Sequence, residues 1–225
     1  RGRRGLDGMT SWGVLFDWDG VILDSSALHE RSWELLAEET GWTLPPGHFK
    51  RGYGMKNEVI IPEMLGWTRD PAEIRRLSHR KEALFRELAA ERGVRALPGV
   101  VEWLAELDRH GVPRAIASST HRQNIEVLLR LLGLGGFEAI IAAEDVARGK
   151  PDPEVFEKAA RALRRPPDRC VVIEDTHAGI AAARAAGCRV IAVATTHPAD
   201  TLQEADRVVG RLDELRVAEV AVWFS

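Results

Sequence analysis

Two aspartates, two positions apart, follow a short apolar run in the sequence GVLFDWDG. Alternate side chains of an extended chain point to the same side, so Asp17 and Asp19 would present their carboxylates together. Two such charges about 4 Å apart repel by about 1 kcal/mol in water, and by several-fold more near a protein surface. A lone pair of this kind more often caps a helix or lies in a turn. Other groups at the same place therefore decide whether the pair carries chemistry.

Further residues that could do chemistry follow three later apolar runs. They are Ser118 and Ser119, with Thr120, after the second run, Lys150 in RGKPDP after the third, and Glu174 and Asp175 at the end of the fourth. Ligands of open parallel sheets bind beyond the carboxyl ends of the strands. We therefore expect all of these side chains to converge with the two aspartates on one edge of a sheet.

Four carboxylates at one edge need a cation among them. Oxygen ligands without histidine or cysteine favour a hard ion, above all Mg²⁺, which commonly takes a substrate phosphate as a further ligand. Lys150 and Ser118 are then suitable partners for phosphoryl oxygens. A carboxylate that the metal does not consume could attack phosphorus. Taken singly, each residue has a simpler explanation as a helix cap, a turn residue or a solvated lysine, but the combination favours phosphoryl chemistry.

The elements that would position these groups alternate between strand and helix. Continuous apolar runs typical of buried parallel strands occupy residues 13–17, 114–118, 138–142, 170–174 and 189–193. Helical periodicity, with glycine or proline at the ends, occupies residues 99–111, 121–133, 153–165 and 177–187. This alternation predicts an α/β protein with a Rossmann-like parallel sheet.

Residues 25–95 lack a comparable strand and instead contain three or four amphipathic helical stretches. We therefore predict an α/β core domain made of residues 11–21 and 97–225, with an inserted helical cap domain of residues 22–96. Residues 1–10, which begin RGRRGLDG, are expected to be a disordered lead or a vector-derived remnant.

Composition limits the possible partners and locations. The 225-residue chain is 45% hydrophobic and 29% charged, and its 31 basic and 34 acidic residues are interleaved to a net charge of −3. This balance does not favour binding to nucleic acid or to an anionic membrane, and no apolar run approaches the ~18 residues of a membrane span. Cys170 and Cys188 are expected to be buried free thiols in a reducing compartment. We expect a cytoplasmic protein that acts on a small molecule, as a monomer rather than an oligomer.

Four motifs in order, FDWDG, AIAS, GKPDP and VVIEDTHAGIAAARAAG, resemble those of the haloacid dehalogenase-like hydrolase superfamily. They extend from residue 16 to residue 187 and so cover most of the chain. The helical insert after the first motif is similar to the α-helical cap of the β-phosphoglucomutase-like phosphatases. Within this superfamily, the resemblance implies that Asp19 favours phosphoryl transfer over dehalogenation, because dehalogenation needs no acid at this position. Trp18 is larger than the residue common there and is expected to pack on the core.

The resemblance implies a role for each motif residue. Asp17 would be the nucleophile and a metal ligand, and Asp19 would be the general acid and base, with its backbone carbonyl on the metal. The remaining implied roles are phosphate binding by Ser118, Ser119 and Lys150, and metal binding by Glu174 and Asp175.

The cap is expected to select the substrate. Candidate contacts are His29, Lys56, Asn57 and Lys81. The segment RGYGMKN, residues 51–57, resembles the cap loop that holds a second phosphate in the mutases, which carry an arginine near the position of Asn57. Lys56 could replace that arginine, or the loop could bind no phosphate at all.

These observations predict a Mg²⁺-dependent phosphatase that hydrolyses a small phosphate monoester, such as a sugar phosphate, through an aspartyl phosphate. The alternative is a phosphomutase of the β-phosphoglucomutase type, in which the phosphoryl group passes to a sugar hydroxyl. A non-enzymatic phospho-acceptor signalling module is a remote alternative, since such receivers are about half this length and lack a helical insert.

Overall fold

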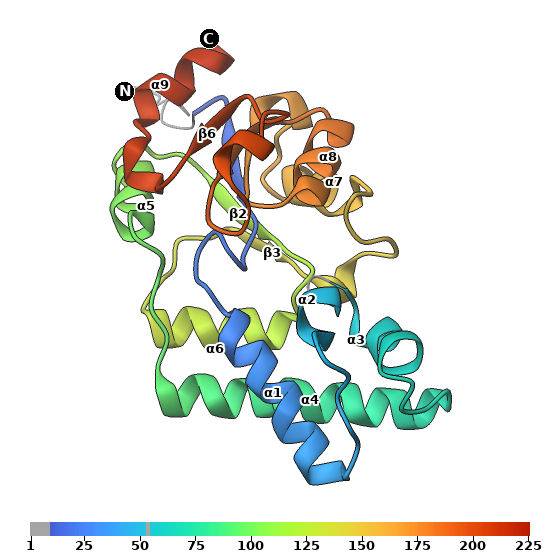
Figure 1. The fold of residues 1–225 in the computed structure, drawn as a ribbon. Coiled ribbons are helices and arrows are strands. Elements are labelled where there is room, and N and C mark those ends of the chain that lie inside the picture. Colours follow the sequence, from blue (N-terminus) through green and yellow to red (C-terminus); the bar gives the residue numbers. More distant parts are fainter. Residues whose placement is uncertain (1–9, 53–54) are drawn as a thin grey trace, which may run out of the picture.

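A computed structural model describes residues 10–52 and 55–225, so most of the predicted lead, together with two positions of the 51–57 loop, lies outside the described residues. The core of the described part is a parallel six-stranded sheet with the order β3-β2-β1-β4-β5-β6 (Figure 1). The strands are β1 (Gly13–Phe16), β2 (Arg114–Ala117), β3 (Ala139–Ile141), β4 (Cys170–Glu174), β5 (Arg189–Val193) and β6 (Arg207–Val209). The predicted α/β class with a Rossmann-like sheet is confirmed.

The outer strands differ from the sequence prediction. β3 is only half-buried, although its apolar run predicts a buried strand, because it lies at an edge of the sheet. β6 at the opposite edge was not predicted. Its three residues follow the charged segment QEAD and are too few to show a period.

Helices cover both faces of the sheet. They are α5 (Val100–Arg109), α6 (Arg122–Leu132), α7 (Glu154–Ala162), α8 (His177–Ala186) and α9 (Val217–Ala221), with short turns η2 (Ala143–Asp145), η3 (Pro167–Arg169), η4 (Ala199–Thr201), η5 (Leu212–Glu214) and η6 (Val222–Phe224). Side chains of β1 alternate between the two faces: Val14 and Phe16 pack with the α5 and α6 side chains, and Leu15 packs with those of α7 and α8. This alternation fixes β1 in the middle of the core.

A helical cap follows β1 in the chain. It contains α1 (Ser26–Thr40), α2 (His48–Gly52), α3 (Asn57–Val59), a π-helical turn η1 (Ile60–Met64) and the long α4 (Pro71–Arg92). Asp70 caps α4 and Pro71 occupies its first turn, which is the start signal that the sequence carries. The cap has a hydrophobic cluster of its own, which includes Trp33, Leu36 and Leu77. Trp33 is therefore a packing residue of the cap.

Two chain crossings connect cap and core, and they lie side by side. Leu23 forms an isolated bridge with Ala96, and the Leu97 amide donates to the Ile22 carbonyl at 2.8 Å. On the core side, α6 runs beside α4 (Figure 1). Helix α4 is thus the part of the cap that rests on the core.

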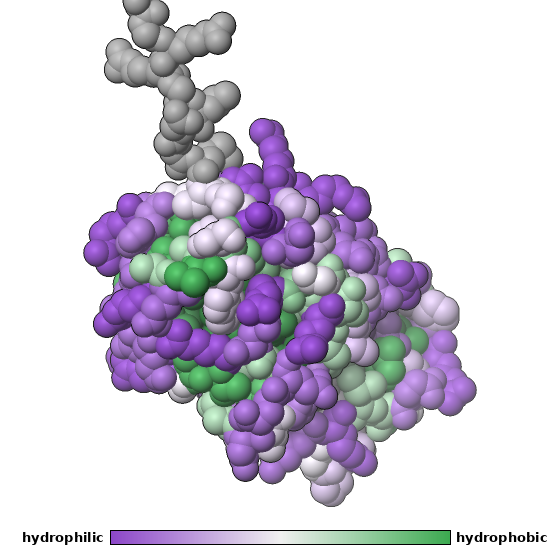
Figure 2. Space-filling model, turned by 90° about the horizontal axis from the view of Figure 1, so that it is seen from above, coloured by the Kyte–Doolittle hydropathy of each residue, from purple (hydrophilic) through white to green (hydrophobic). Residues whose placement is uncertain are grey.

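The remaining predictions concern which side chains are buried and what covers the surface. Cys170 and Cys188 are buried free thiols, and Trp18 is fully buried. Hydrophilic residues cover most of the face in Figure 2, with smaller apolar areas between them. Among the described helices, none is long and apolar enough to span a membrane.

Candidate active site

Three carboxylates meet where β1 and β4 end. The two strands pair in parallel, with Phe16 opposite Ile173, so Asp17 and Glu174 emerge side by side and Asp175 follows. Oxygens of these three residues lie within 4.8 Å of one another. All three are buried, with Asp17 exposed by only 8%. The strand register therefore brings together three of the four carboxylates that the sequence predicts at this edge.

Lys150 enters this cluster from the loop before α7. Its Nζ lies 2.7 Å from Asp17 Oδ1 and 2.6 Å from Glu174 Oε1, and it lies over the ring of Phe156. Burial disfavours the ammonium charge, yet the two carboxylates raise the pKa of Lys150 well above its ordinary value. Lys150 is thus a fixed cation beside the predicted nucleophile.

The acids carry more negative charge than Lys150 alone balances. Burial raises the pKa of Asp17 to about 7, and Glu174 adds to the effect. Burial together with Asp17 raises the pKa of Asp175 to about 8. Asp175 Oδ2 accepts a hydrogen bond from Thr196, whereas the buried Oδ1 has no hydrogen-bond partner among the described residues. A buried carboxylate oxygen without a partner, in a set of oxygen donors only, fits a hard divalent cation.

Glu174 contributes an oxygen to this cluster and also accepts hydrogen bonds from its neighbours. Its Oε2 accepts from the Asp175 and Thr176 amides at 2.8 and 2.9 Å and from the Thr176 hydroxyl at 3.0 Å, while Oε1 accepts from Lys150. Glu174 therefore orients the loop that carries Asp175, and it holds Lys150 in place.

Gly179 makes room for the Glu174 carboxylate. A Cβ at position 179 would overlap this carboxylate, and the Gly179 amide donates to the N-cap Thr176. Gly179→Ala should lower stability by about 1–3 kcal/mol, as overpacking does, and should also reduce turnover by displacing Lys150. Thermal unfolding and phosphate release would measure both effects. Gly135→Ala is the matched control, since a Cβ there has open space. If the two variants behave alike, the close packing of Gly179 has no role.

Asp19 turns its side chain away from the acidic cluster. Its two oxygens accept hydrogen bonds from the hydroxyls of Ser25 and Thr120, and His29 Nε2 lies 4.0 Å from Oδ1. Gly20 has a φ of 78°, and a side chain there would overlap Asp175, so the turn after Asp19 requires glycine. The two opening aspartates thus serve two separate places, one at the cation cluster and one at the boundary with the cap.

The two predicted phosphate-binding serines differ in burial. Ser118 is buried and its Oγ accepts from the Thr120 amide at 3.0 Å, while Ser119 is exposed. Sequence reasoning missed Ser25 and Thr196. Thr196 lies three residues beyond β5, so the rule that ligands bind beyond strand ends could have found it. Ser25 is held in place by the fold of the cap crossing and has no sequence signal.

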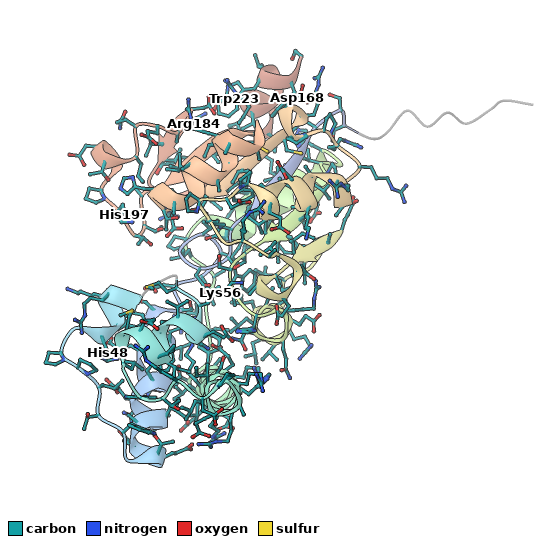
Figure 3. All side chains as sticks on the ribbon, turned by 90° about the vertical axis from the view of Figure 1, so that its right-hand side faces the viewer. His48, Lys56, Asp168, Arg184, His197 and Trp223 are labelled. Carbon is teal, nitrogen blue, oxygen red and sulfur yellow. The ribbon has the colours of Figure 1, made fainter. Side chains whose placement is uncertain are left out.

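The predicted cap contacts separate into two kinds. Lys81 and Asn57 are buried, and their side chains donate to Glu82 at 3.0 and 2.7 Å. Burial, with the neighbouring Lys81, lowers the pKa of His29 to about 4. Lys56 is exposed and lies where the cap faces the core (Figure 3). Lys81 and Asn57 are therefore engaged inside the cap, whereas the Lys56 side chain is exposed to solvent.

A family model described as haloacid dehalogenase-like hydrolase matches residues 13–187. The chain belongs to this family. The resemblance stated from the motifs is confirmed, and so is the expectation that the protein is an enzyme. The signalling-module alternative is thereby set aside.

Relatives of known activity match over most of the chain. A 5-amino-6-(5-phospho-D-ribitylamino)uracil phosphatase from Arabidopsis thaliana chloroplasts is 40% identical over 92% of this chain, which spans 56% of that protein. Hexitol phosphatase A from Escherichia coli is 34% identical, with 92% of this chain and 94% of that protein covered. β-Phosphoglucomutase from Bacillus subtilis is 32% identical, with 90% of each covered. Both phosphatases and a phosphomutase are thus similar to this hydrolase.

Solved structures agree with the fold. The CbbY protein from Rhodobacter sphaeroides in complex with phosphate superposes with a TM-score of 0.83 at 29% identity, over 93% of this chain and 98% of that one. A β-phosphoglucomutase from Clostridium difficile superposes with a TM-score of 0.81 at 25% identity, over 96% and 97%. The inserted cap therefore belongs to an arrangement shared with other members of the family.

Proposed function

We propose that this hydrolase is a Mg²⁺-dependent phosphatase that cleaves a small sugar or polyol phosphate through an aspartyl phosphate on Asp17. The observation that carries the proposal is the placement of Asp17 Oδ1 2.7 Å from the buried ammonium of Lys150. A nucleophilic carboxylate beside a fixed cation suits attack on an anionic phosphate.

In the proposed first step, Asp17 attacks phosphorus in line while Lys150 binds a phosphoryl oxygen. The bond from phosphorus to the leaving oxygen breaks, and Asp19 donates a proton to that oxygen. Water then attacks phosphorus and gives a proton to Asp19. The bond between phosphorus and the Asp17 oxygen breaks, and phosphate is released. Asp17, Glu174 and Asp175, together with the Asp19 carbonyl, would hold Mg²⁺, which would neutralise phosphoryl charge when bound.

The names of two relatives support an open-chain substrate. One relative acts on a phospho-D-ribitylamino compound and the other is named for hexitols, so both names describe a phosphate on a linear polyol. A polyol needs hydrogen-bond donors in the cap, and Lys56 is exposed there. We therefore propose alditol phosphates as the first substrates to test.

Phosphate release from alditol phosphates, sugar phosphates, phosphoglycolate and nucleotides, with and without Mg²⁺, tests the function. A chelator should reduce release by about 100-fold or more, because a bound metal contributes several kcal/mol of charge stabilisation in the transition state. Added Mg²⁺ should restore it. Full activity after chelation and gel filtration would overturn the metal assignment.

The phosphomutase remains a second candidate, favoured by the 32% identity to β-phosphoglucomutase over 90% of both chains. Production of glucose 6-phosphate from β-glucose 1-phosphate, without release of phosphate, would replace the phosphatase proposal.

A further inference from the structure

The carboxylate of Glu82 joins the cap to the core at a buried point. Glu82 lies on cap helix α4 and is 7% exposed. Its Oε1 accepts from Asn57 and Lys81, and its Oε2 accepts from Asn124 Nδ2 at 2.5 Å. Asn124 lies on core helix α6 and is fully buried. A buried carboxylate is costly unless its lone pairs are satisfied, and here three donors from two domains satisfy them.

The orientation of the Asn124 amide is fixed by a second residue of α4. Arg86 Nη1 donates to Asn124 Oδ1 at 2.8 Å, while the amide nitrogen donates to Glu82. Arg86 and Glu82 are four positions apart and therefore lie on the same face of α4. Reversing the amide would turn its NH₂ group toward Arg86, which only donates. The Asn124 amide can therefore satisfy both partners in one orientation only, with its oxygen toward Arg86 and its nitrogen toward Glu82.

From Glu82 a chain of contacts leads to Asp19. Lys81 Nζ lies 3.0 Å from Glu82 and 2.7 Å from His29 Nδ1. Because an ammonium only donates, Nδ1 of His29 accepts and Nε2 carries the hydrogen. That nitrogen is the one that lies 4.0 Å from Asp19 Oδ1. His29 also stacks on Phe85 at 4.1 Å, which holds the plane of its ring.

We propose that Glu82 is a positioning residue for Asp19, and that Asn124 of the core holds it in that role. Glu82 keeps Lys81 directed at His29, and His29 in turn holds its Nε2 4.0 Å from the carboxylate that serves as general acid. The contact to Asn124 sets α4 against α6 and therefore sets how far His29 stands from Asp19. This inference rests on the proposed function, in which Asp19 protonates the leaving group.

Substrates with different leaving groups can distinguish a positioning role of Glu82 from a purely structural role. An alkoxide leaves poorly and needs the proton from Asp19, whereas p-nitrophenolate leaves without one. Glu82→Gln places an NH₂ group against either Asn124 or Lys81. We expect kcat/KM for sorbitol 6-phosphate to fall by about 10- to 100-fold, within the range that general acid catalysis contributes. The value for p-nitrophenyl phosphate should stay within about 3-fold of wild type, since that step needs no acid.

Two further variants complete the test. Glu87→Gln on the same helix is the matched control, because Glu87 is exposed and pairs only with Arg80 among the described contacts. The double variant Glu82→Gln with Asn124→Asp rebuilds every contact. The oxygen of the introduced glutamine accepts from Asn57 and Lys81, its nitrogen donates to the introduced aspartate, and that aspartate also accepts from Arg86. We expect this pair to recover most of the lost alkyl phosphate activity.

Equal losses with both substrates in Glu82→Gln, or no loss with either, would overturn the inference. If Glu82→Gln does not fold, Asn124→Ala tests the same contact from the core side, and the same ratio of activities decides. A wild-type enzyme that releases phosphate from neither substrate would overturn the proposed function itself. An active wild type with an unchanged ratio in the variants would overturn only the role of Glu82.

Discussion

Asp17→Asn should reduce phosphate release by at least about 10³-fold while the protein keeps its fold. An amide cannot form the covalent phosphate, and loss of a covalent nucleophile commonly costs several orders of magnitude. The stability should remain close to that of the wild type. Burial and Glu174 already raise the pKa of Asp17 to about 7, so a neutral side chain at this position removes a charge that the cluster disfavours. The lost ion pair with Lys150 opposes that gain.

Three measurements check this expectation. Release of inorganic phosphate gives the rate, thermal unfolding gives the stability, and acid-quenched enzyme shows whether phosphate is bound covalently. Asp168→Asn is the matched control, since Asp168 is exposed on η3 at the opposite end of the core from the cap (Figure 3). A purified Asp17→Asn enzyme with activity near that of Asp168→Asn would remove Asp17 from the role of nucleophile.

Strand ends explain why the acidic cluster could be predicted from sequence. The apolar runs of β1, β2 and β4 are followed directly by residues of the candidate site, and parallel strands align those ends at one edge of the sheet. The register of β1 and β4 then needs no further information to bring Asp17 beside Glu174. The sequence predicts the position of Glu174 but not its hydrogen bonds with the Thr176 amide and with Lys150.

The link between cap and core could not be predicted in this way. Glu82 and Asn124 are 42 positions apart and lie on helices of two different domains. Helical periodicity assigns each of them to a face but gives no partner, and a glutamate next to a lysine on a helix usually lies in solvent. The packing of α4 on α6 brings them together, and this packing depends on how the cap docks. A hydrogen bond between side chains of two domains therefore cannot be predicted from a single sequence in the way that strand ends can.

Lys150→Met should destabilise the protein by about 3–5 kcal/mol, the range found when one partner of a buried ion pair is removed. Methionine keeps the contact with Phe156 but leaves Asp17 and Glu174 without the cation that lies 2.7 and 2.6 Å from them. Phosphate release should fall by about 100-fold or more, because a fixed charge aimed at the transferring group is lost. Lys158→Met is the control: Lys158 donates to Glu154 and to the Asp145 carbonyl, outside the acidic cluster, and is 38% exposed, so its loss should cost less stability and leave phosphate release unchanged.

The stability deficit of Lys150→Met should depend on pH in a defined direction. Burial raises the pKa of Asp17 to about 7 even with Lys150 present, and removal of Lys150 raises it further. A carboxyl whose folded pKa lies above its unfolded value binds its proton more tightly in the folded state, so it costs stability as pH rises through that range. The difference in unfolding free energy between variant and wild type should therefore be smallest near pH 5 and largest above pH 8. A deficit that stays constant from pH 5 to pH 9 would mean that Lys150 stabilises the fold by packing and not by balancing the charge of Asp17.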